Sequence, residues 1–123
     1  MLPADQRLRD NRDFRAIYAR GRSHVHGLAV IYAMRRTGES VQAAPGRRIG
    51  FVVSKKQGDA VVRNRIKRRL REAVRLRLAD LRDEPFDLIF VGRSRLKSAD
   101  WAEVQAAVEE LLRRANLLAR PGD

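Results

Sequence analysis

Apolar residues near the start of the chain recur at the spacing of a helix. Phe14, Ile17 and Tyr18 lie three and four positions apart, and Gly21 follows where a helix can end. This pattern predicts a short first helix over residues 10–19.

Runs of β-branched and aromatic residues predict strands farther along. Residues 28–34 and 48–54 are two such runs, and residues 35–47 between them are polar and contain Gly and Pro. We therefore expect neighbouring antiparallel strands joined by a long hairpin loop. Residues 86–91 are almost continuously apolar, which is typical of a strand covered on both faces.

Two further helices are expected. After a turn at residues 55–58, Asp59 can accept hydrogen bonds from the first turn of a helix that runs to about residue 82. Asp100 can begin the last helix, with Glu103 completing a capping box. The apolar stripe of this helix is Trp101, Val104, Val108, Leu111, Leu112 and Ala115.

The elements fit one compact domain, in the order helix, strands, helix, strand, helix. The chain has 123 residues, of which 44% are hydrophobic, enough for a modest core. Neither a repeat nor a long interior linker is evident. We expect an ordered core of about residues 7–118 and a short flexible C-terminal tail.

The net charge of the chain says more about its function than its length does. Lys and Arg total 27 against 15 Asp and Glu, which gives a formal net charge of +12 and a pI near 11.5. Solubility alone needs a net charge of only about 2 to 8 in a small domain. The excess therefore favours a polyanionic partner.

The compartment is expected to be the cytoplasm. The chain has no cysteine, which excludes disulfides and thiolate zinc sites. Apolar runs are all shorter than the roughly 20 residues of a membrane span, and residues 1–12 carry charges where a signal peptide is apolar. We expect no membrane partner.

The second helix carries the clearest functional signal. Positions 59–82 hold nine Lys and Arg against three acids. At 100° per residue its apolar residues fall on one side, while Arg65, Arg68, Arg69 and Arg75 fall on the other. Guanidinium groups in a row suit phosphates, so this face predicts nucleic-acid binding. There are two alternatives: the face is merely solvated, or the helix lies on an anionic membrane or in the groove of a calmodulin-like protein.

Aromatic residues near basic ones suggest a second contact. Phe14 and Tyr18 lie on the first helix and Tyr32 on the first strand. Rings of this kind stack on the bases of single-stranded nucleic acid. From spacing alone, however, a pair four residues apart on a helix is more often part of a core.

Candidates for catalysis are few. His24 and His26 could share one face of an extended segment, but no cysteine or carboxylate lies near them. The acidic residues Asp80, Asp83, Glu84 and Asp87 are best interpreted as a solvated helix end and loop. We therefore predict no catalytic residue and no metal site, and an RNA-cleaving activity would need another component for its chemistry.

Residues 54–75, SKKQGDAVVRNRIKRRLREAVR, resemble the signature of the bacterial ribonuclease P protein subunit family. Residues 13–21, the strand ending GFVVSKK and residues 86–93 resemble other segments of that family. The resemblance covers about residues 7–118 and leaves residues 35–47 unmatched. It implies an α+β domain of order αβββαβα, similar to domain 2 of ribosomal protein S5. Its mostly antiparallel sheet would include a left-handed βαβ crossover, against the usual right-handed rule.

The resemblance also implies a function and its residues. In that family the RNA subunit, with bound magnesium, cleaves the 5′ leader from precursor tRNA, and the protein binds both RNAs and no small-molecule substrate. Matching positions for the RNA subunit are Lys55, Lys56, Arg63, Asn64, Arg65, Lys67, Arg68 and Arg69. Positions matching the leader cleft, with nearby cations, are Phe14, Tyr18, Tyr32, Arg9 and Arg12. A ribosomal or general RNA-binding protein and a protein-only nuclease are the alternatives.

Overall fold

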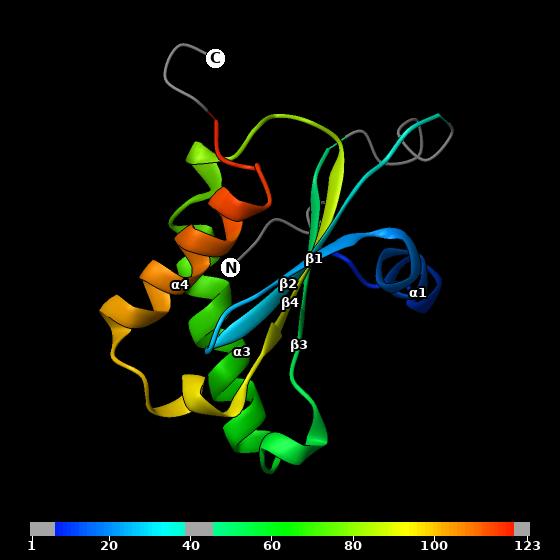
Figure 1. Cartoon of the computed structure of the whole chain (residues 1–123). Coiled ribbons are helices and arrows are strands. Elements are labelled where there is room, and N and C mark those ends of the chain that lie inside the picture. Colours follow the sequence, from blue (N-terminus) through cyan, green and yellow to red (C-terminus); the bar gives the residue numbers. More distant parts are fainter. Residues whose placement is uncertain (1–6, 39–45, 120–123) are drawn as a thin grey trace.

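A central β-sheet separates helices on its two faces (Figure 1). The computed structural model describes residues 7–38 and 46–119. Helix α1 covers part of one face, and α3 and α4 cover the other. The helices are α1 (Asn11–Arg20), α3 (Ala60–Arg75) and α4 (Trp101–Arg114), and the strands are β1 (Arg22–Val25), β2 (Ala29–Arg35), β3 (Arg48–Val52) and β4 (Phe86–Gly92). The predicted α+β order αβββαβα is confirmed, while residues 120–123 of the predicted tail lie outside the described residues.

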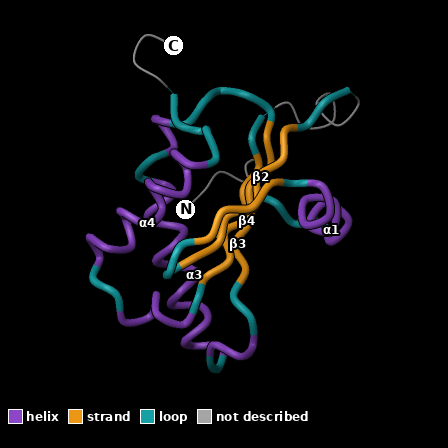
Figure 2. The backbone as a smooth tube through the Cα atoms, viewed as in Figure 1, coloured by secondary structure: helices purple, strands orange, loops and turns teal. Residues whose placement is uncertain are grey.

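The strand order is β1-β2-β4-β3, which corrects one expectation. The strands β2 and β3 are not a hairpin, because β4 lies between them, antiparallel to β2 and parallel to β3 (Figure 2). A run buried on both faces needs hydrogen-bond partners along both edges, so β4 takes the central place. Helix α3 connects the parallel pair β3 and β4, and the left-handed sense of this crossover stays a prediction of the resemblance.

Helix α3 begins where it was predicted to begin and ends before its predicted end. The Asp59 side chain accepts a hydrogen bond from the Val62 amide at 3.0 Å. The helix stops at Arg75 rather than near residue 82, and a 3-10 turn, η3 (Leu78–Asp80), follows. Its 16 residues span about 24 Å. The seven residues of β4 span about 23 Å, so a longer helix would pass the end of the sheet.

The main core lies between the sheet and helices α3 and α4. The apolar stripe of α3 is buried there, and so are four of the six residues predicted for α4. Asp100 and Glu103 form the predicted capping box. Trp101, the first residue of α4, is 37% exposed, so its assignment to the buried stripe is wrong. The buried residues of the two helices are Ile66, Leu70, Ala73, Val74, Val104, Ala107, Val108, Leu111 and Leu112.

The opposite face of the sheet is only partly covered. There Ile17 of α1 packs with Leu8 and Ile89 in a small second cluster. Phe14, Tyr32, Met34, Val52 and Val91 surround it and keep part of their surface exposed. A sheet face of this kind can accept a ligand beside α1.

One row of charged side chains ties α1 to the sheet. Asp87 of β4 is 1% exposed and accepts from Nε and Nη2 of Arg48 at 2.9 and 2.8 Å. Nε of Arg36 lies 2.9 Å from the same carboxylate, and Nη1 of Arg48 reaches Asp13 of α1 at 3.0 Å. Hydrogen bonding to Asp87 raises the pKa of Arg48, whereas burial lowers that of Arg36. Asp87 is therefore structural, and its interpretation as part of a solvated acidic end is wrong.

The substitution Asp87→Asn is expected to lower the free energy of unfolding by about 3–5 kcal/mol, because it leaves buried arginine charge without its counterion. Urea unfolding followed by circular dichroism measures this as a lower midpoint at an unchanged slope. The matched control is Glu84→Gln, which removes one carboxylate from the exposed Arg35–Glu84 pair and should cost less than about 1 kcal/mol. Equal losses in the two variants would contradict the structural role of Asp87.

Candidate nucleic-acid interface

A hollow of about 270 Å³ opens at the β3 edge of the sheet, between the segment before α1, β3 and α3. Arg7 bridges to Ile49 in parallel, and the Leu8 amide donates to the Ile49 carbonyl at 3.0 Å. These contacts bring Arg9 to the rim. The lining is Arg7, Leu8, Arg9, Phe14, Ile49, Gly50, Phe51, Lys67 and Arg71, which we call the edge hollow.

Gly50 determines where the Phe14 ring lies in this hollow. A Cβ at position 50 would stand 2.7 Å from Cζ and 2.9 Å from Cε1 of Phe14. Such separations are far below a van der Waals contact, so the ring fits only because position 50 has no side chain. The absence of a side chain on one residue of β3 thus brings an aromatic face to the edge hollow.

Cations and rings meet in the edge hollow. The guanidinium carbon of Arg71 stands 5.7 Å from the centroid of the Phe51 ring, within cation–π range. Phe51 in turn stacks on buried Phe90, with centroids 5.9 Å apart. Lys67 lies one helical turn before Arg71 and lines the same space. The sequence analysis missed Arg71 and Phe51, although the i, i+4 spacing of Lys67 and Arg71 was a usable signal.

The predicted aromatic residues occupy two neighbouring places. Phe14 lines the edge hollow, whereas Tyr18 and Tyr32 pair with each other edge to face, with centroids 4.8 Å apart. Tyr18 is 42% exposed, and burial of its hydroxyl together with the Tyr32 phenol raises its pKa. Its phenol therefore stays neutral well above neutral pH, with part of the ring open to solvent.

The arginines of α3 fall into two groups. Arg65 and Arg68 are exposed and form no side-chain hydrogen bond or ion pair within residues 7–38 and 46–119. Arg69 donates to the carbonyls of Leu96 and Ala99 at 2.5 and 2.6 Å, so its guanidinium holds the following segment against α3. Arg75 donates to Glu72, which raises the pKa of Arg75 and lowers that of Glu72.

The other predicted polar residues lie in several places. Lys55 and Lys56 are exposed in a 3-10 turn, η2 (Lys55–Gln57), directly before α3, and Asn64 is exposed on the helix. Arg63 is half-buried, and its Nε is buried without a hydrogen-bond partner in the described structure. Arg12 extends into solvent, 3.8 Å from the Asp10 carboxylate. Of the predicted cations, Arg9 and Lys67 line the edge hollow.

Known proteins identify the family. The sequence model described as Ribonuclease P matches residues 2–116. The chain is 40% identical over 116 residues to a ribonuclease P protein component of Symbiobacterium thermophilum, covering 94% of this chain and 96% of the relative. It is 37% identical to that of Clostridium novyi, covering 94% and 98%. The chain belongs to the ribonuclease P protein family.

Solved structures of ribonuclease P proteins share the fold. The Staphylococcus aureus protein superposes with a TM-score of 0.78 at 30% identity, over 93% of this chain and 98% of that one. A Staphylococcus aureus mutant described as defective in mRNA degradation activity gives 0.79 at 30% identity, over 92% and 90%. The Thermotoga maritima protein gives 0.73 at 29% identity, over 88% and 96%. The likeness thus covers nearly the whole ribonuclease P domain.

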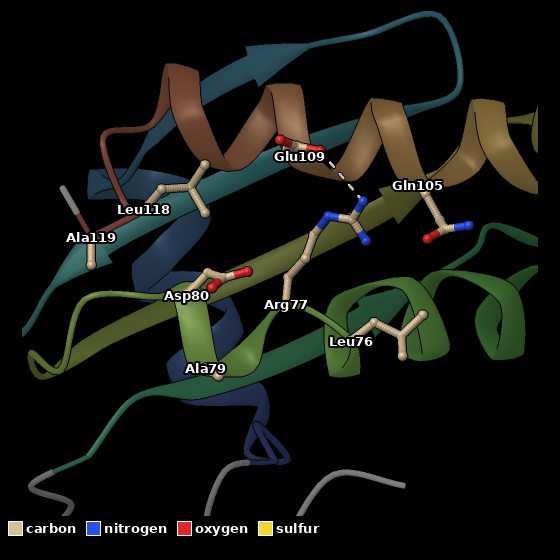
Figure 3. A pocket seen from close by; sticks show the side chains of 8 residues that line it. All are labelled: Leu76, Arg77, Ala79, Asp80, Gln105, Glu109, Leu118 and Ala119. Carbon is tan, nitrogen blue, oxygen red and sulfur yellow. Dashed lines mark hydrogen bonds and ion pairs between the residues drawn. The ribbon is translucent and has the colours of Figure 1, made fainter. Parts of the chain in front are cut away.

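A hollow larger than the edge hollow lies elsewhere on this ribonuclease P family chain, between η3 and α4. It measures about 690 Å³, and its rim carries both signs of charge, Arg77 beside Glu109 and Asp80 (Figure 3). Nη2 of Arg77 lies 3.4 Å from Oε2 of Glu109. Mixed charge does not select a polyanion, so the smaller edge hollow is the better RNA candidate.

His26, one of the remaining candidates for chemistry, has structural contacts, and the expectation that no carboxylate lies near it is wrong, because α4 brings Glu110 beside it. His26 Nδ1 accepts from the Leu28 amide at 3.1 Å, and its Nε2 lies 3.3 Å from Glu110. Within residues 7–38 and 46–119, no group of three or more His, Cys, Asp or Glu is arranged to hold a metal ion. No helix in that part of the chain is long and apolar enough to cross a membrane.

The substitution Gly50→Ala is expected to lower the free energy of unfolding by about 1–3 kcal/mol, because the new Cβ overlaps the Phe14 ring. Urea unfolding measures this loss of stability. In the control Gly46→Ala, the new Cβ has no atom within 4 Å, so the free energy of unfolding should be unchanged or slightly raised.

A double-mutant cycle tests the cause. Combining Gly50→Ala with Phe14→Leu should cost less than the sum of the two single losses, with a coupling of about 0.5–3 kcal/mol. Additive losses would show that the ring does not limit position 50.

Proposed function

We propose that this chain is the protein subunit of a ribonuclease P ribonucleoprotein that removes the 5′ leader from precursor tRNA. The observation that carries the proposal is the edge hollow, where Phe14 and Phe51 lie beside Arg9, Lys67 and Arg71. Single-stranded RNA is bound by this combination, since bases stack on rings while cations hold phosphates. The leader would lie along this hollow and past Tyr18 and Tyr32, on the open part of the sheet.

The proposed contact with the RNA subunit is the exposed row at the start of α3. It consists of Lys55, Lys56, Asn64, Arg65 and Arg68, whose side chains donate no hydrogen bond within the described residues. Half-buried Arg63 would join it through its terminal nitrogens. Arg69 contributes charge but few free donors, because two carbonyls already accept from it. Cations on one face offset the repulsion between two RNAs.

The chemistry is assigned to RNA with magnesium, and the chain is proposed to be non-catalytic. Asp13 and Asp87 lie near the open sheet face, but both are engaged by Arg48. Hydrogen bonds from Arg48 occupy oxygens of both carboxylates, and Asp87 is 1% exposed, so neither group is placed to accept a proton from a substrate. Magnesium would therefore be bound mainly by the RNA partner. Such a subunit would act in the cytoplasm, on precursor tRNA rather than on a membrane or a small molecule.

Two other functions are separable from this one. A ribosomal or general RNA-binding protein of the same fold would bind tRNA equally with and without a leader. A second candidate is mRNA degradation, which the similarity to the Staphylococcus aureus protein favours. That activity would have to appear with this chain alone.

Magnesium-dependent cleavage of a precursor tRNA at near-physiological salt decides among these functions. The reactions contain a bacterial ribonuclease P RNA alone, this protein alone, or both, with a leaderless tRNA as binding control. We expect cleavage at the mature 5′ end only when both components are present. Cutting of precursor tRNA or mRNA by the protein alone would make it a nuclease, and equal binding of both tRNAs without stimulated cleavage would leave a general RNA-binding protein.

The substitution Arg68→Ala is expected to weaken binding of the ribonuclease P RNA and to reduce the salt dependence by about 0.7–0.9 log units, the loss of one phosphate contact. Filter binding at several salt concentrations measures both. The control Arg75→Ala removes a cation from the same helix, but the Arg75 side chain already donates to Glu72. Its effect on RNA binding and on the salt dependence should therefore be smaller. Equal effects would indicate a response to net charge alone.

The substitution Tyr18→Leu should instead weaken binding of the leader, by about 1–3 kcal/mol if one base stacks on the ring. Tyr18 is suited to this test because it is 42% exposed, whereas Phe14 packs against Gly50. Assembly with the ribonuclease P RNA should be unchanged. Equal affinity for precursor and leaderless tRNA in the wild type would remove the basis for this expectation.

A further inference from the structure

The edge strand β1 stops short of its partner. It has four residues against seven in β2, and the last pair of the ladder joins Arg22 to Ala33. Within the described ranges, Met34 and Arg35 therefore pair only with β4. A hollow of about 550 Å³ lies at this end of β1, bounded by the ends of α1 and α4.

Five basic side chains from four elements line this hollow, which we call the β1 hollow. They are Arg20 at the end of α1, Arg22 and His24 on β1, Arg35 on β2 and Arg114 at the end of α4. No Asp or Glu belongs to its lining. Its apolar part includes Ala33, Phe86 and Leu117. Four guanidinium groups around one concave surface create a positive potential that attracts an anion.

The donors differ in how far they are engaged. Arg20 and Arg22 form no side-chain hydrogen bond or ion pair with any residue in the described ranges. Nη1 of Arg114 donates to the Val25 carbonyl at 2.8 Å, which fixes that side chain against β1. Arg35 is partly neutralised by Glu84 at 2.6 Å. The site thus combines two guanidinium groups without a partner in the described ranges, those of Arg20 and Arg22, with the guanidinium of Arg114, which its hydrogen bond already holds in place.

Protection of an edge strand does not account for this arrangement. Charged side chains on such strands discourage pairing with a second sheet, which would explain Arg22 alone. It does not explain why Arg20 from a helix on one face and Arg114 from a helix on the other converge on the same hollow. Nor does the hollow carry the opposite charges that the Arg77–Glu109 hollow has.

We propose that the β1 hollow binds phosphodiester groups of RNA, as a site separate from α3 and from the edge hollow. Separation follows from the strand order, because β1 and β3 are opposite edges of the sheet. Three strand spacings place them about 14 Å apart. One guanidinium group can donate two parallel hydrogen bonds to the oxygens of one phosphate. Arg20 and Arg22 together can therefore bind two neighbouring phosphates. The phosphates come from the RNA subunit or from precursor tRNA, and this assignment rests on the proposed function.

The test compares two double variants of the full chain. Arg20→Ala/Arg22→Ala empties the β1 hollow of its free cations. The control, Arg15→Ala/Arg113→Ala, removes two exposed cations from α1 and α4 that line none of the three hollows described above. A third variant, Arg20→Lys/Arg22→Lys, keeps the charge. Thermal unfolding should be similar in all of them, because the substituted side chains have no partner inside the described structure.

Three binding curves are measured against salt concentration. They use a ribonuclease P RNA, precursor tRNA added to the assembled holoenzyme, and an unrelated RNA hairpin. We expect the hollow variant to lose about 1.4–1.8 log units of salt slope in one of the first two curves, twice the value for one phosphate. The control should lose clearly less, and the lysine variant should recover most of the slope. The curve that changes identifies the source of the phosphates.

Equal losses in the hollow variant and its control, on every RNA, would overturn the site and show an effect of net charge. A failure of the proposed function has a different result. If the wild type does not stimulate a ribonuclease P RNA, but the hollow variant still loses slope on the hairpin, the phosphate site stands without that function. If the wild type stimulates cleavage and the two double variants match, only the site fails.

Discussion

The buried carboxylate of Asp87 is the constraint on which the rest of this fold depends. It lies on the central strand and holds two arginines, Arg48 on the edge strand and Arg36 just after β2. Through Arg48 the same group reaches Asp13 on α1. An incomplete set of charges in an interior is strongly unfavourable, so the members must all be in place together. Three strands and the first helix are thereby held in one register.

The position of α1 makes the binding surface possible. Asp13 is anchored and Phe14 follows it, so the aromatic ring is directed onto β3 at Gly50. A ten-residue helix cannot cover a four-stranded sheet, and apolar residues beside it stay partly exposed. The same geometry that completes the small second cluster therefore leaves a concave, partly aromatic surface at the β3 edge.

Arginine serves two purposes in this chain, and neighbouring positions can differ. Arg68 is exposed, whereas Arg69 donates to two carbonyls before α4. One residue along a helix is a rotation of 100°, enough to move a guanidinium from solvent to a neighbouring segment. High net charge and a stable fold are compatible here because several guanidinium groups donate hydrogen bonds to backbone carbonyls. Arg47, Arg69, Arg77 and Arg114 are examples.

The sequence by itself determined the excess of positive charge, the three helices and the strands β2, β3 and β4, because composition, periodicity and capping depend on the chain alone or on a few neighbouring residues. Strand β1 was implied only by the resemblance. The resemblance predicted Phe14 and Arg9 for the leader and Lys67 for the RNA subunit, and the fold brings all three into one hollow. Only the tertiary structure decided that β4 lies between β2 and β3, that Asp87 is buried, and that Arg20, Arg22 and Arg114 converge. These facts depend on contacts between residues far apart in the chain. Strand pairing and burial are decided by the whole set of competing partners, which no local pattern records.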